Sequence, residues 1–348
     1  MKEEMVNIVG MGARTSIGFN MLTTASAVRA KMNRFAEHPY MLDQAGEPMI
    51  VAMDAELPEE VIDSTWFIQL AVPAVLEALR PVKKFRLPIV LFIGFPAQRP
   101  GLPSNLMTEM ELNLAKELGG HFSPIQIFAC GQAATLLAME QATQLIHHKQ
   151  ADLCLVGGVD SYLPPETLEW LDFHERLHSN RHRYGFIPGE AAGFCLLASQ
   201  RAVQRLPLKS LAHLSAVASA YEKNRINTDT VCIGEGLTSV FHQVFQTLEA
   251  TPHRVEQIFC DLNGERYRAD EYGFSVLRTR EYFVDPSHFI APADCWGEVG
   301  AATGTLLINL AVVAAMKGYA KGELSLIWTS SEGGERGAVL LHAKPQSV

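Results

Sequence analysis

The stretch IQIFACGQAATLL, residues 125–137, carries the strongest structural signal in the chain. An apolar run ends at Cys130 and small residues then begin a helical pattern, which predicts a strand followed directly by a helix. Cys130 would then lie at a helix N-terminus, where unpaired N–H groups and the macrodipole stabilise a thiolate. The pattern therefore favours a nucleophilic cysteine, with a buried core thiol as the alternative.

Short apolar runs alternate with helical patterns along the rest of the chain. Strands are predicted at 6–11, 87–95, 125–129, 153–157, 192–198, 212–220, 257–261, 323–329 and 338–342, and helices at 237–250 and 301–317. This alternation indicates an α/β fold with a largely parallel sheet covered by helices. The region near residue 207 contains no glycine or serine tract, which predicts one compact body rather than two hinged domains.

The composition is that of an ordinary globular protein. The 348 residues are 48% hydrophobic, and a formal charge of −9 provides no basic footprint for nucleic acid. The first residues lack the basic region, apolar core and cleavage site of a signal peptide, which predicts a cytoplasmic protein. The apolar segment 300–316 contains Thr303 and Asn309 and is short for a bilayer span, so a buried helix is predicted there.

The six cysteines are scattered, without a C-x-x-C pair or metal-ligand spacing. Cys154 and Cys195 lie in apolar strand-like runs, where cysteine behaves as a small hydrophobe. No disulfide framework, metal site or cofactor is predicted. The early glycine pair, Gly10 and Gly12, lacks the rest of a dinucleotide-binding pattern.

Several segments resemble the β-ketoacyl synthases of the thiolase superfamily, in the same order and approximate spacing. They are VNIVGMGARTSIG (6–18), IQIFACGQAATLL (125–137), ADLCLVGGVD (151–160), RYGFIPGEAAGFCLL (183–197), GEVGAATG (297–304) and SEGGERGA (331–338). The resemblance implies an α/β, thiolase-like five-layered αβαβα fold made of two duplicated halves. Residues 1–206 would form the half that carries Cys130, and residues 207–348 would form the other half.

The resemblance also implies partners and a biological context. Family members form homodimers across a central strand edge, to which residues 87–95 and 125–128 are expected to contribute. An acyl-carrier protein or a coenzyme A thioester is the expected partner, with no nucleic acid and no membrane span. Fatty acid or polyketide biosynthesis is the implied context.

The positions that match the family's catalytic groups have changed. The family pairs its cysteine with two histidines; Asn263 best matches the first, and Glu298 stands at the second. Ala293 replaces a lysine of the family pattern. An asparagine can still donate a hydrogen bond, whereas an ionised Glu298 donates none and would repel an enolate or a thiolate. Because one lost transition-state donor costs about 2.7–4 kcal/mol, decarboxylative condensation is not expected.

Two further features follow from the resemblance. The backbone N–H of Cys130 and one from the Gly333-Gly334 loop would bind an oxyanion. Glu190 matches a glutamate of the family pattern. A buried carboxylate is costly unless it is hydrogen-bonded, so a supporting structural role behind the site is favoured for Glu190 over direct catalysis.

The stretch HERLHSNRHRY, residues 174–184, is rich in histidine and arginine and is predicted to form a loop. It offers a docking place for an acidic carrier domain or a phosphopantetheine phosphate. A solvated surface loop is the alternative, and it is favoured because glycine-rich phosphate geometry is missing.

Two functions remain open on the sequence alone. One is a diverged acyltransferase of the β-ketoacyl synthase type, or a thioester hydrolase, that loads an acyl group on Cys130 and uses Glu298 as a base. The other is a pseudoenzyme: a non-catalytic thiolase-fold accessory, assembly or chain-length-determining partner. The retained cysteine favours the first, and the combined changes at Asn263, Ala293 and Glu298 favour the second.

Overall fold

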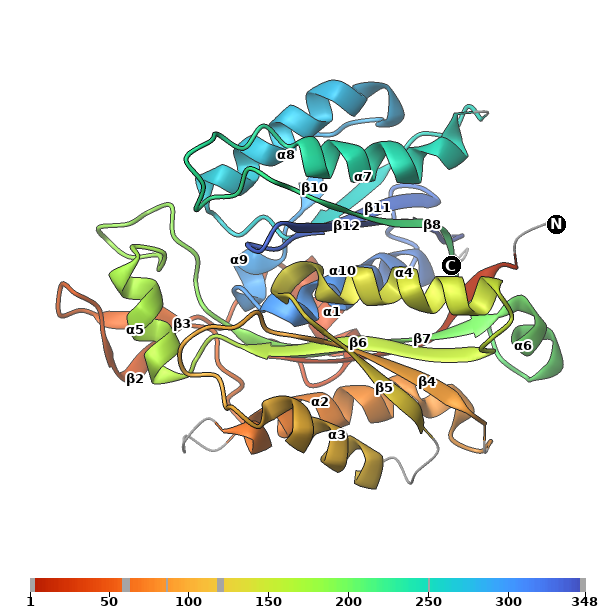
Figure 1. Ribbon diagram of the computed structural model, residues 1–348, viewed down its shortest axis with the longest axis horizontal. Coiled ribbons are helices and arrows are strands. Elements are labelled where there is room, and N and C mark those ends of the chain that lie inside the picture. Colours follow the sequence, from red (N-terminus) through yellow and green to blue (C-terminus); the bar gives the residue numbers. More distant parts are fainter. Residues whose placement is uncertain (1–3, 58–62, 86, 118–121, 250, 345–348) are drawn as a thin grey trace.

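The chain folds into alternating layers of helices and sheet, in the order αβαβα (Figure 1). The structure, a computed structural model, describes residues 4–57, 63–85, 87–117, 122–249 and 251–344. The first layer contains helices α2 (Ser64–Ala78) and α3 (Leu106–Glu117), and a first set of strands follows it. The middle layer contains helices α4 (Ala134–His147) and α10 (Thr303–Met316). A second set of strands and then helices α7 (Glu235–Phe245) and α8 (Arg266–Thr279) complete the order. The expected five-layered fold is confirmed.

Two sets of strands join into one 10-stranded sheet through a short antiparallel pairing of β1 with β8. The first set contains β1 (Val6–Thr15), β4 (Ile89–Phe95), β5 (Phe122–Ala129), β6 (Leu153–Ser161) and β7 (Glu190–Ser199). The second contains β8 (Ala212–Tyr221), β9 (Gln257–Cys260), β10 (Phe289–Ile290), β11 (Leu324–Ser330) and β12 (Glu335–His342). The spatial order is β10-β9-β11-β12-β8-β1-β7-β6-β4-β5.

Both sets repeat one topology. Outward from the junction, the first runs β1-β7-β6-β4-β5 and the second β8-β12-β11-β9-β10, which is the same order of strands along the chain in each half. The orientations also agree, with two antiparallel pairs followed by two parallel pairs. The halves are therefore duplicated, although their division into domains at residue 206 stays a prediction. The expectation of a largely parallel sheet was wrong, because the last strand of each half returns antiparallel to its neighbours.

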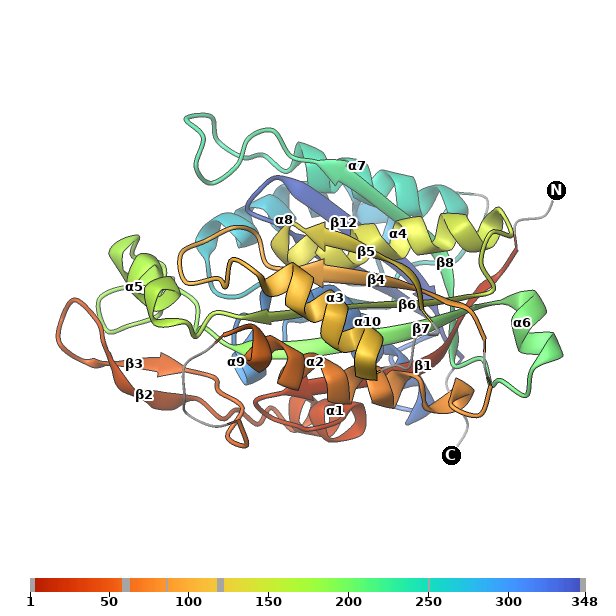
Figure 2. The ribbon, with the colours of Figure 1, turned by 60° about the horizontal axis from the view of Figure 1, so that its bottom comes forward.

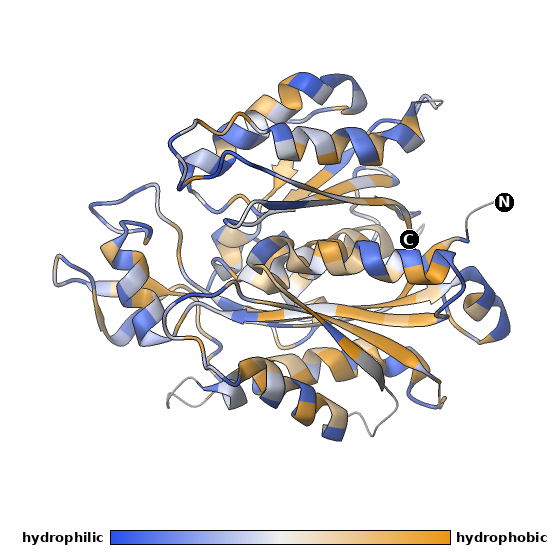
Figure 3. Cartoon of the chain, viewed as in Figure 1, coloured by the Kyte–Doolittle hydropathy of each residue, from blue (hydrophilic) through white to orange (hydrophobic). Residues whose placement is uncertain are grey.

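The middle layer explains the most apolar segment of the sequence. Residues 303–315 of α10 are all buried, between the two sets of strands. A helix that is apolar all round belongs in a core, so the buried helix predicted over 301–317 is confirmed. Figure 3 shows apolar residues concentrated in the strands and alternating with polar ones on the outer helices α7 and α8. Among the described residues, no helix has both the length and the apolar character to span a membrane.

A small cap projects at one end of the layers, where β2, β3 and α5 lie together in Figures 1 and 2. Strands β2 (Ala36–Leu42) and β3 (Pro48–Val51) form an antiparallel hairpin that the apolar pattern did not predict. The cap also contains α5 (Pro165–Phe173) and has its own apolar cluster. The remaining elements are α1 (Met21–Arg29), α6 (Gln200–Arg205), α9 (Ala293–Trp296) and the 3₁₀ turns η1 (Arg80–Val82), η2 (Gly131–Ala133), η3 (Gln246–Leu248), η4 (Arg280–Tyr282) and η5 (Gly300–Ala302).

The early glycines of β1 have a packing role. A Cβ atom at Gly12 would lie 1.9 Å from the carbonyl oxygen of Ala74, and one at Gly10 would lie 2.1 Å from that of Ala78. Helix α2 therefore packs against β1 at a distance that only glycine permits.

Candidate active site

Cys130 lies where β5 ends and the buried helix α4 begins, as predicted. It is the N-cap residue of η2, which continues directly into α4. The duplicated half repeats the arrangement, because η5 precedes α10 in the same way. Gly131 and Gly300 have φ values of +78° and +48°, so each turn uses backbone space that favours glycine. The two buried helices therefore begin side by side at the centre of the molecule.

The environment of the Cys130 thiol does not favour a thiolate. Burial raises the pKa of Cys130 to about 12, and the negative charge of Glu335 adds to this. One N–H of the first turn is also occupied, because Ala133 N donates to Ser331 Oγ at 2.8 Å. The expected stabilisation by the helix N-terminus is thus opposed by desolvation and by a carboxylate, and Cys130 is a neutral thiol at neutral pH.

The glycine loop after β11 lies next to this turn, as the resemblance implied. Ser331 connects the two, since its Oγ accepts the hydrogen bond from Ala133 of η2. Gly334, with φ +114°, donates its N–H to the carbonyl of Ser331 at 3.2 Å. The Gly333 carbonyl accepts a hydrogen bond from Arg225 Nη1 at 3.1 Å. The N–H of Gly334 is therefore engaged inside its own turn, and the oxyanion role of this loop stays a prediction.

Asn263 and Glu298, which were predicted as partners of the cysteine, contact each other. Asn263 Nδ2 donates to Glu298 Oε2 at 2.7 Å, and the two side chains are 8% and 3% exposed. Asn263 Nδ2 also donates to Glu265 Oε2 at 3.2 Å, and its Oδ1 accepts from the N–H of Glu265 at 3.1 Å. Glu298 Oε1 accepts from the N–H of Gly300 at 2.9 Å. Both amide hydrogens of Asn263 are therefore directed at carboxylates.

Arg268 of α8 balances the negative charge around this pair. Its Nη1 donates to Asp261 Oδ2 at 3.1 Å and to the Ser330 carbonyl at 2.7 Å, and its Nε donates to Glu265 at 3.3 Å. Burial raises the pKa of Glu298, and the charge of Arg268 opposes that shift. Burial likewise raises the pKa of Asp261 to about 7, against the effect of Arg268. Asn263 and Glu298 are therefore part of a buried ionic cluster.

Arg176 ties the histidine- and arginine-rich segment to the same cluster. Its Nε donates to Glu265 Oε1 at 2.7 Å, and its Nη1 lies 2.7 Å from Glu332 Oε1. Its guanidinium also lies 5.3 Å from the ring centroid of Phe186. This arginine is internal rather than part of a solvated loop. Farther along the segment, residues 180–185 line an open hollow of about 300 Å³.

Ala293, which was predicted to stand at the position of a family lysine, lies beside Glu298. Both line a cavity of about 10 Å³, together with Asp261 and Thr303. A space of this size holds about one water molecule. Asn263, Ala293 and Glu298 are therefore neighbours in space, and the cavity that Ala293 and Glu298 line is nearly filled. His288, ten residues before Glu298 in the chain, is exposed.

A second polar cluster, which the sequence did not reveal, joins the starts of α4 and α10. Asp160 accepts the N–H of Ala301 at 2.9 Å and a hydrogen bond from Arg99 Nη2 at 2.6 Å. The Arg99 guanidinium lies 4.0 Å from the ring centroid of Tyr162, whose hydroxyl accepts from Gln132 Nε2 at 3.2 Å. Arg99 follows β4 in a proline-rich segment, and only the fold brings it to this place.

Comparison with known proteins agrees with this architecture. The family model "Beta-ketoacyl synthase, N-terminal domain" matches residues 126–202. One similar structure is a complex between a type II polyketide synthase acyl-carrier protein and its ketosynthase bound to the hexaketide. A chain of that complex superposes on this one with a TM-score of 0.81 and 15% sequence identity. The match covers 98% of this chain and 100% of that chain. The chain has a ketosynthase fold.

Other solved structures give the same result. A chain of the ketosynthase in complex with its chain length factor from Xenorhabdus doucetiae has a TM-score of 0.78, 14% identity and 98% coverage of both chains. The ketosynthase from module 6 of the bacillaene synthase of Bacillus subtilis 168 has a TM-score of 0.77 and 13% identity over 97% of this chain and 72% of that one. No curated protein matches the sequence. At these identities the likeness concerns the ketosynthase fold, and the chemistry depends on the residues of the site.

Glu190, the glutamate of the ketosynthase pattern, is fully buried and accepts three hydrogen bonds. They come from Trp66 Nε1 at 2.6 Å, the N–H of Asp54 at 2.9 Å and Ser161 Oγ at 3.0 Å. Burial raises the pKa of Glu190 to about 7, although these donors oppose the shift. The carboxylate joins β7, α2 and β6. It contacts none of the groups around Cys130 described above. This agrees with the structural role behind the site that the sequence favoured for Glu190.

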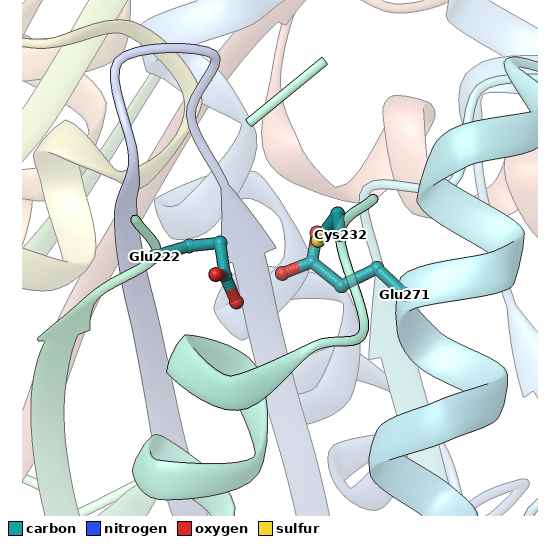
Figure 4. A group of neighbouring side chains, drawn as sticks. All are labelled: Glu222, Cys232 and Glu271. Carbon is teal, nitrogen blue, oxygen red and sulfur yellow. The ribbon is translucent and has the colours of Figure 1, made fainter. Parts of the chain in front are cut away.

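A further group in the ketosynthase fold has the residue types of a metal site. Glu222, Cys232 and Glu271 bring one oxygen or sulfur atom each within 4.8 Å of one another (Figure 4). Both oxygens of Glu271 accept from Arg336, at 2.6 and 3.1 Å, and Glu222 accepts from the N–H of Gly236 at 2.8 Å. An arginine and the N-terminus of α7 already balance these carboxylates, so the group acts as an internal ion-pair cluster.

Proposed function

We propose that this chain is a non-condensing subunit of a ketosynthase-type assembly. It would pair with another thiolase-fold chain and would not itself form carbon–carbon bonds. Of the two functions that the sequence left open, this is the pseudoenzyme and partner function.

The observation that carries the proposal is the pairing of Asn263 with Glu298. Condensation needs hydrogen-bond donors aimed at an enolate oxygen. The two amide hydrogens of Asn263 are directed at Glu298 and Glu265, and an ionised Glu298 has no hydrogen to donate. The donor set of the reaction is therefore replaced by side chains that satisfy one another.

The state of Cys130 supports the same conclusion. A thiol with a pKa of about 12 is almost entirely protonated at neutral pH, and the thiolate is the reactive form. Glu335, which contributes to this pKa, lies on β12, and its Oε2 is buried without a hydrogen-bond partner. A negative charge beside the sulfur would also oppose an oxyanion at the same place.

We assign the pairing with a second thiolase-fold chain to the open edge of strand β5. Among the described strands it is an edge strand, which pairs with β4 on one side, and Ile127 on it is 37% exposed. Strand β4 was also expected at the edge, but it lies between β6 and β5 and has no free side. An open edge with an apolar side chain is suited to pairing with the same strand of a second thiolase-fold chain. A second copy would give the homodimer expected from the sequence, and a ketosynthase subunit would give a pair like the ketosynthase and chain length factor of the similar structures.

The decisive experiment is a decarboxylation assay with malonyl-carrier protein and malonyl-coenzyme A. The purified chain is expected to release no carbon dioxide above the rate of the Cys130→Ala variant. An active ketosynthase, assayed in parallel, shows that the substrates are competent. The proposal would be refuted if the chain released carbon dioxide at a rate comparable with that enzyme and the Cys130→Ala variant did not.

Pairing is tested separately by light scattering at micromolar concentration. The chain is expected to be a dimer, and Ile127→Lys is expected to shift it toward monomer while circular dichroism stays unchanged. Leu277→Lys is the matched control, because Leu277 is 75% exposed on the outer helix α8. A monomeric wild-type chain, or dissociation by both variants alike, would contradict the assignment to β5.

Acyl transfer at Cys130 is the second candidate, and one observation favours it. The cysteine is only half-buried and occupies the turn before a buried helix, with alanine and glycine beside it. Incubation with acyl-coenzyme A followed by intact-mass measurement tests this function. A thioester on Cys130 that turns over onto an added acceptor would establish it.

A further inference from the structure

A second cavity, separate from the surroundings of Cys130, lies between the cap and α2. It has a volume of about 870 Å³. Its described walls come from the β2 hairpin strand, the segment after β3, the start of α2, the loop after β4 and the start of α5. Pockets for small organic ligands have volumes of about 300–1,000 Å³. The cavity is therefore large enough for a ligand rather than a few waters.

The walls are apolar and held in place. Apolar side chains make up much of the lining: Pro39, Met53, Leu57, Trp66, Leu102, Pro103, Leu163 and Pro165. Trp66 is fixed by its 2.6 Å hydrogen bond to Glu190. Behind the lining residues of α5 and the loop after β4, Thr167 Oγ1 donates to the Pro100 carbonyl at 2.6 Å, which ties these two segments together. Prolines and these bonds leave little freedom to lose on binding, so the cavity is largely preformed.

The described residues of the lining include no lysine or arginine, and the one histidine, His38, uses its Nδ1 to accept the backbone N–H groups of Tyr40 and Met41. The permanently charged groups of this lining are therefore acidic. They are Asp54, Asp63 and Glu166. Asp54 is paired with Arg14, whereas Asp63 and Glu166 are exposed at the starts of α2 and α5. Neither of these two is in an ion pair within the described part of the chain. The mouth thus disfavours a fatty acid carboxylate or a phosphate and attracts a cation.

We propose that this cavity binds a small apolar ligand that carries a protonated amine. The apolar body would lie against Trp66, Leu102 and Leu163, and the ammonium group would lie near Glu166 and Asp63. The face of Trp66 adds a cation–π surface for a charge that enters more deeply. The site is distinct from the one discussed under the proposed function and does not depend on it.

The test uses three ligands that have the same ten-carbon alkyl tail and different head groups. They are decylamine, decanol and decanoate, each at a concentration below micelle formation. Isothermal titration calorimetry at low ionic strength is expected to show one site, with decylamine bound at least about tenfold more tightly than decanoate and decanol in between. The preference for the amine is expected to shrink at higher salt, because exposed charges are screened. Absence of saturable binding, or equal binding of amine and carboxylate, would overturn the proposal.

Two variants and one control test where in the cavity the ligand binds. Glu166→Gln is expected to reduce decylamine affinity severalfold and to leave decanol affinity unchanged. Glu169→Gln, on the exposed part of the same helix but not on the cavity wall, is the matched control and is expected to change neither. Leu102→Trp is expected to abolish binding of both ligands by filling the cavity. Equal effects of Glu166→Gln and Glu169→Gln would show a general charge effect and would refute this location.

Discussion

Asn263 and Glu298 share a hydrogen bond of 2.7 Å, although 34 residues separate them in the chain. Each side chain satisfies the other inside a buried ionic cluster that includes Glu265, Arg268 and Arg176. The two side chains therefore form one structural unit, in which Asn263 is the donor and Glu298 is its acceptor.

The first prediction concerns the stability of this pair. Glu298 accepts one hydrogen bond from the amide of Asn263 and one from the N–H of Gly300. In Glu298→Gln, the new NH₂ group must therefore face one of these two donors, and two donors cannot bond to each other. An unsatisfied buried donor costs about 1–3 kcal/mol, so the urea midpoint is expected to fall accordingly. Glu281→Gln, at an exposed position, is the control and is expected to have no effect. A Glu298→Gln variant as stable as the wild type would contradict the assigned bonds.

The second prediction concerns thiol reactivity. Burial and the charge of Glu335 raise the pKa of Cys130, so Glu335→Gln is expected to speed its alkylation, by up to about tenfold for each pKa unit recovered. Glu298 is not among the charges that shift this thiol, so Glu298→Gln serves as the control and is expected to leave the rate unchanged. Peptide mapping after brief iodoacetamide treatment measures both rates.

The order of labelling among the cysteines gives a third, separate prediction. The sequence favoured Cys130 as the most reactive thiol. Cys232 is also half-buried and its pKa is raised less, to about 11, by burial and by Glu271. Cys232 is therefore expected to be alkylated before Cys130, and the buried Cys154 and Cys195 after both. Labelling of Cys130 first would show that the helix N-terminus outweighs burial and Glu335.

The fourth prediction uses Trp66 as a reporter of Glu190. Burial raises the pKa of Glu190 to about 7, and Trp66 donates to this carboxylate. A fluorescence transition with a midpoint near pH 7 is expected in the wild type and is expected to be missing in Glu190→Gln. Because the folded pKa is raised, the folded chain keeps a proton that the unfolded chain releases above about pH 4.5, so this contribution to stability is lost between about pH 4.5 and 7. A flat fluorescence profile in the wild type would argue against the shift.

The fifth prediction concerns the contact of α2 with β1. A Cβ at Gly12 would lie 1.9 Å from the Ala74 carbonyl, so Gly12→Ala is expected to destabilise the fold by about 3 kcal/mol or more. Gly273→Ala is the matched control, because nothing lies within 4 Å of a Cβ there and the residue is inside helix α8. That variant is expected to stabilise the chain by about 0.5–1 kcal/mol. Thermal unfolding of both variants measures the difference.

The sequence determined the features that depend on neighbouring residues. The apolar runs predicted most strands, the all-apolar pattern predicted buried α10, and the small residues after Cys130 predicted the start of a helix. These signals are local because side-chain periodicity reflects which face of a strand or helix is buried. The order of the matching segments also predicted the five-layered, duplicated fold.

Only the tertiary structure decided the chemistry of the site and the direction of the strands. The antiparallel return of β7 and β12, and the bonds that connect Arg176 and Arg268 to Glu265, join segments whose spacing carries no periodic signal. The pKa of Cys130 depends on its burial and on Glu335, which is 205 residues later in the chain. Desolvation and Coulomb interactions depend on distance in space, and a local pattern around the cysteine does not contain that distance.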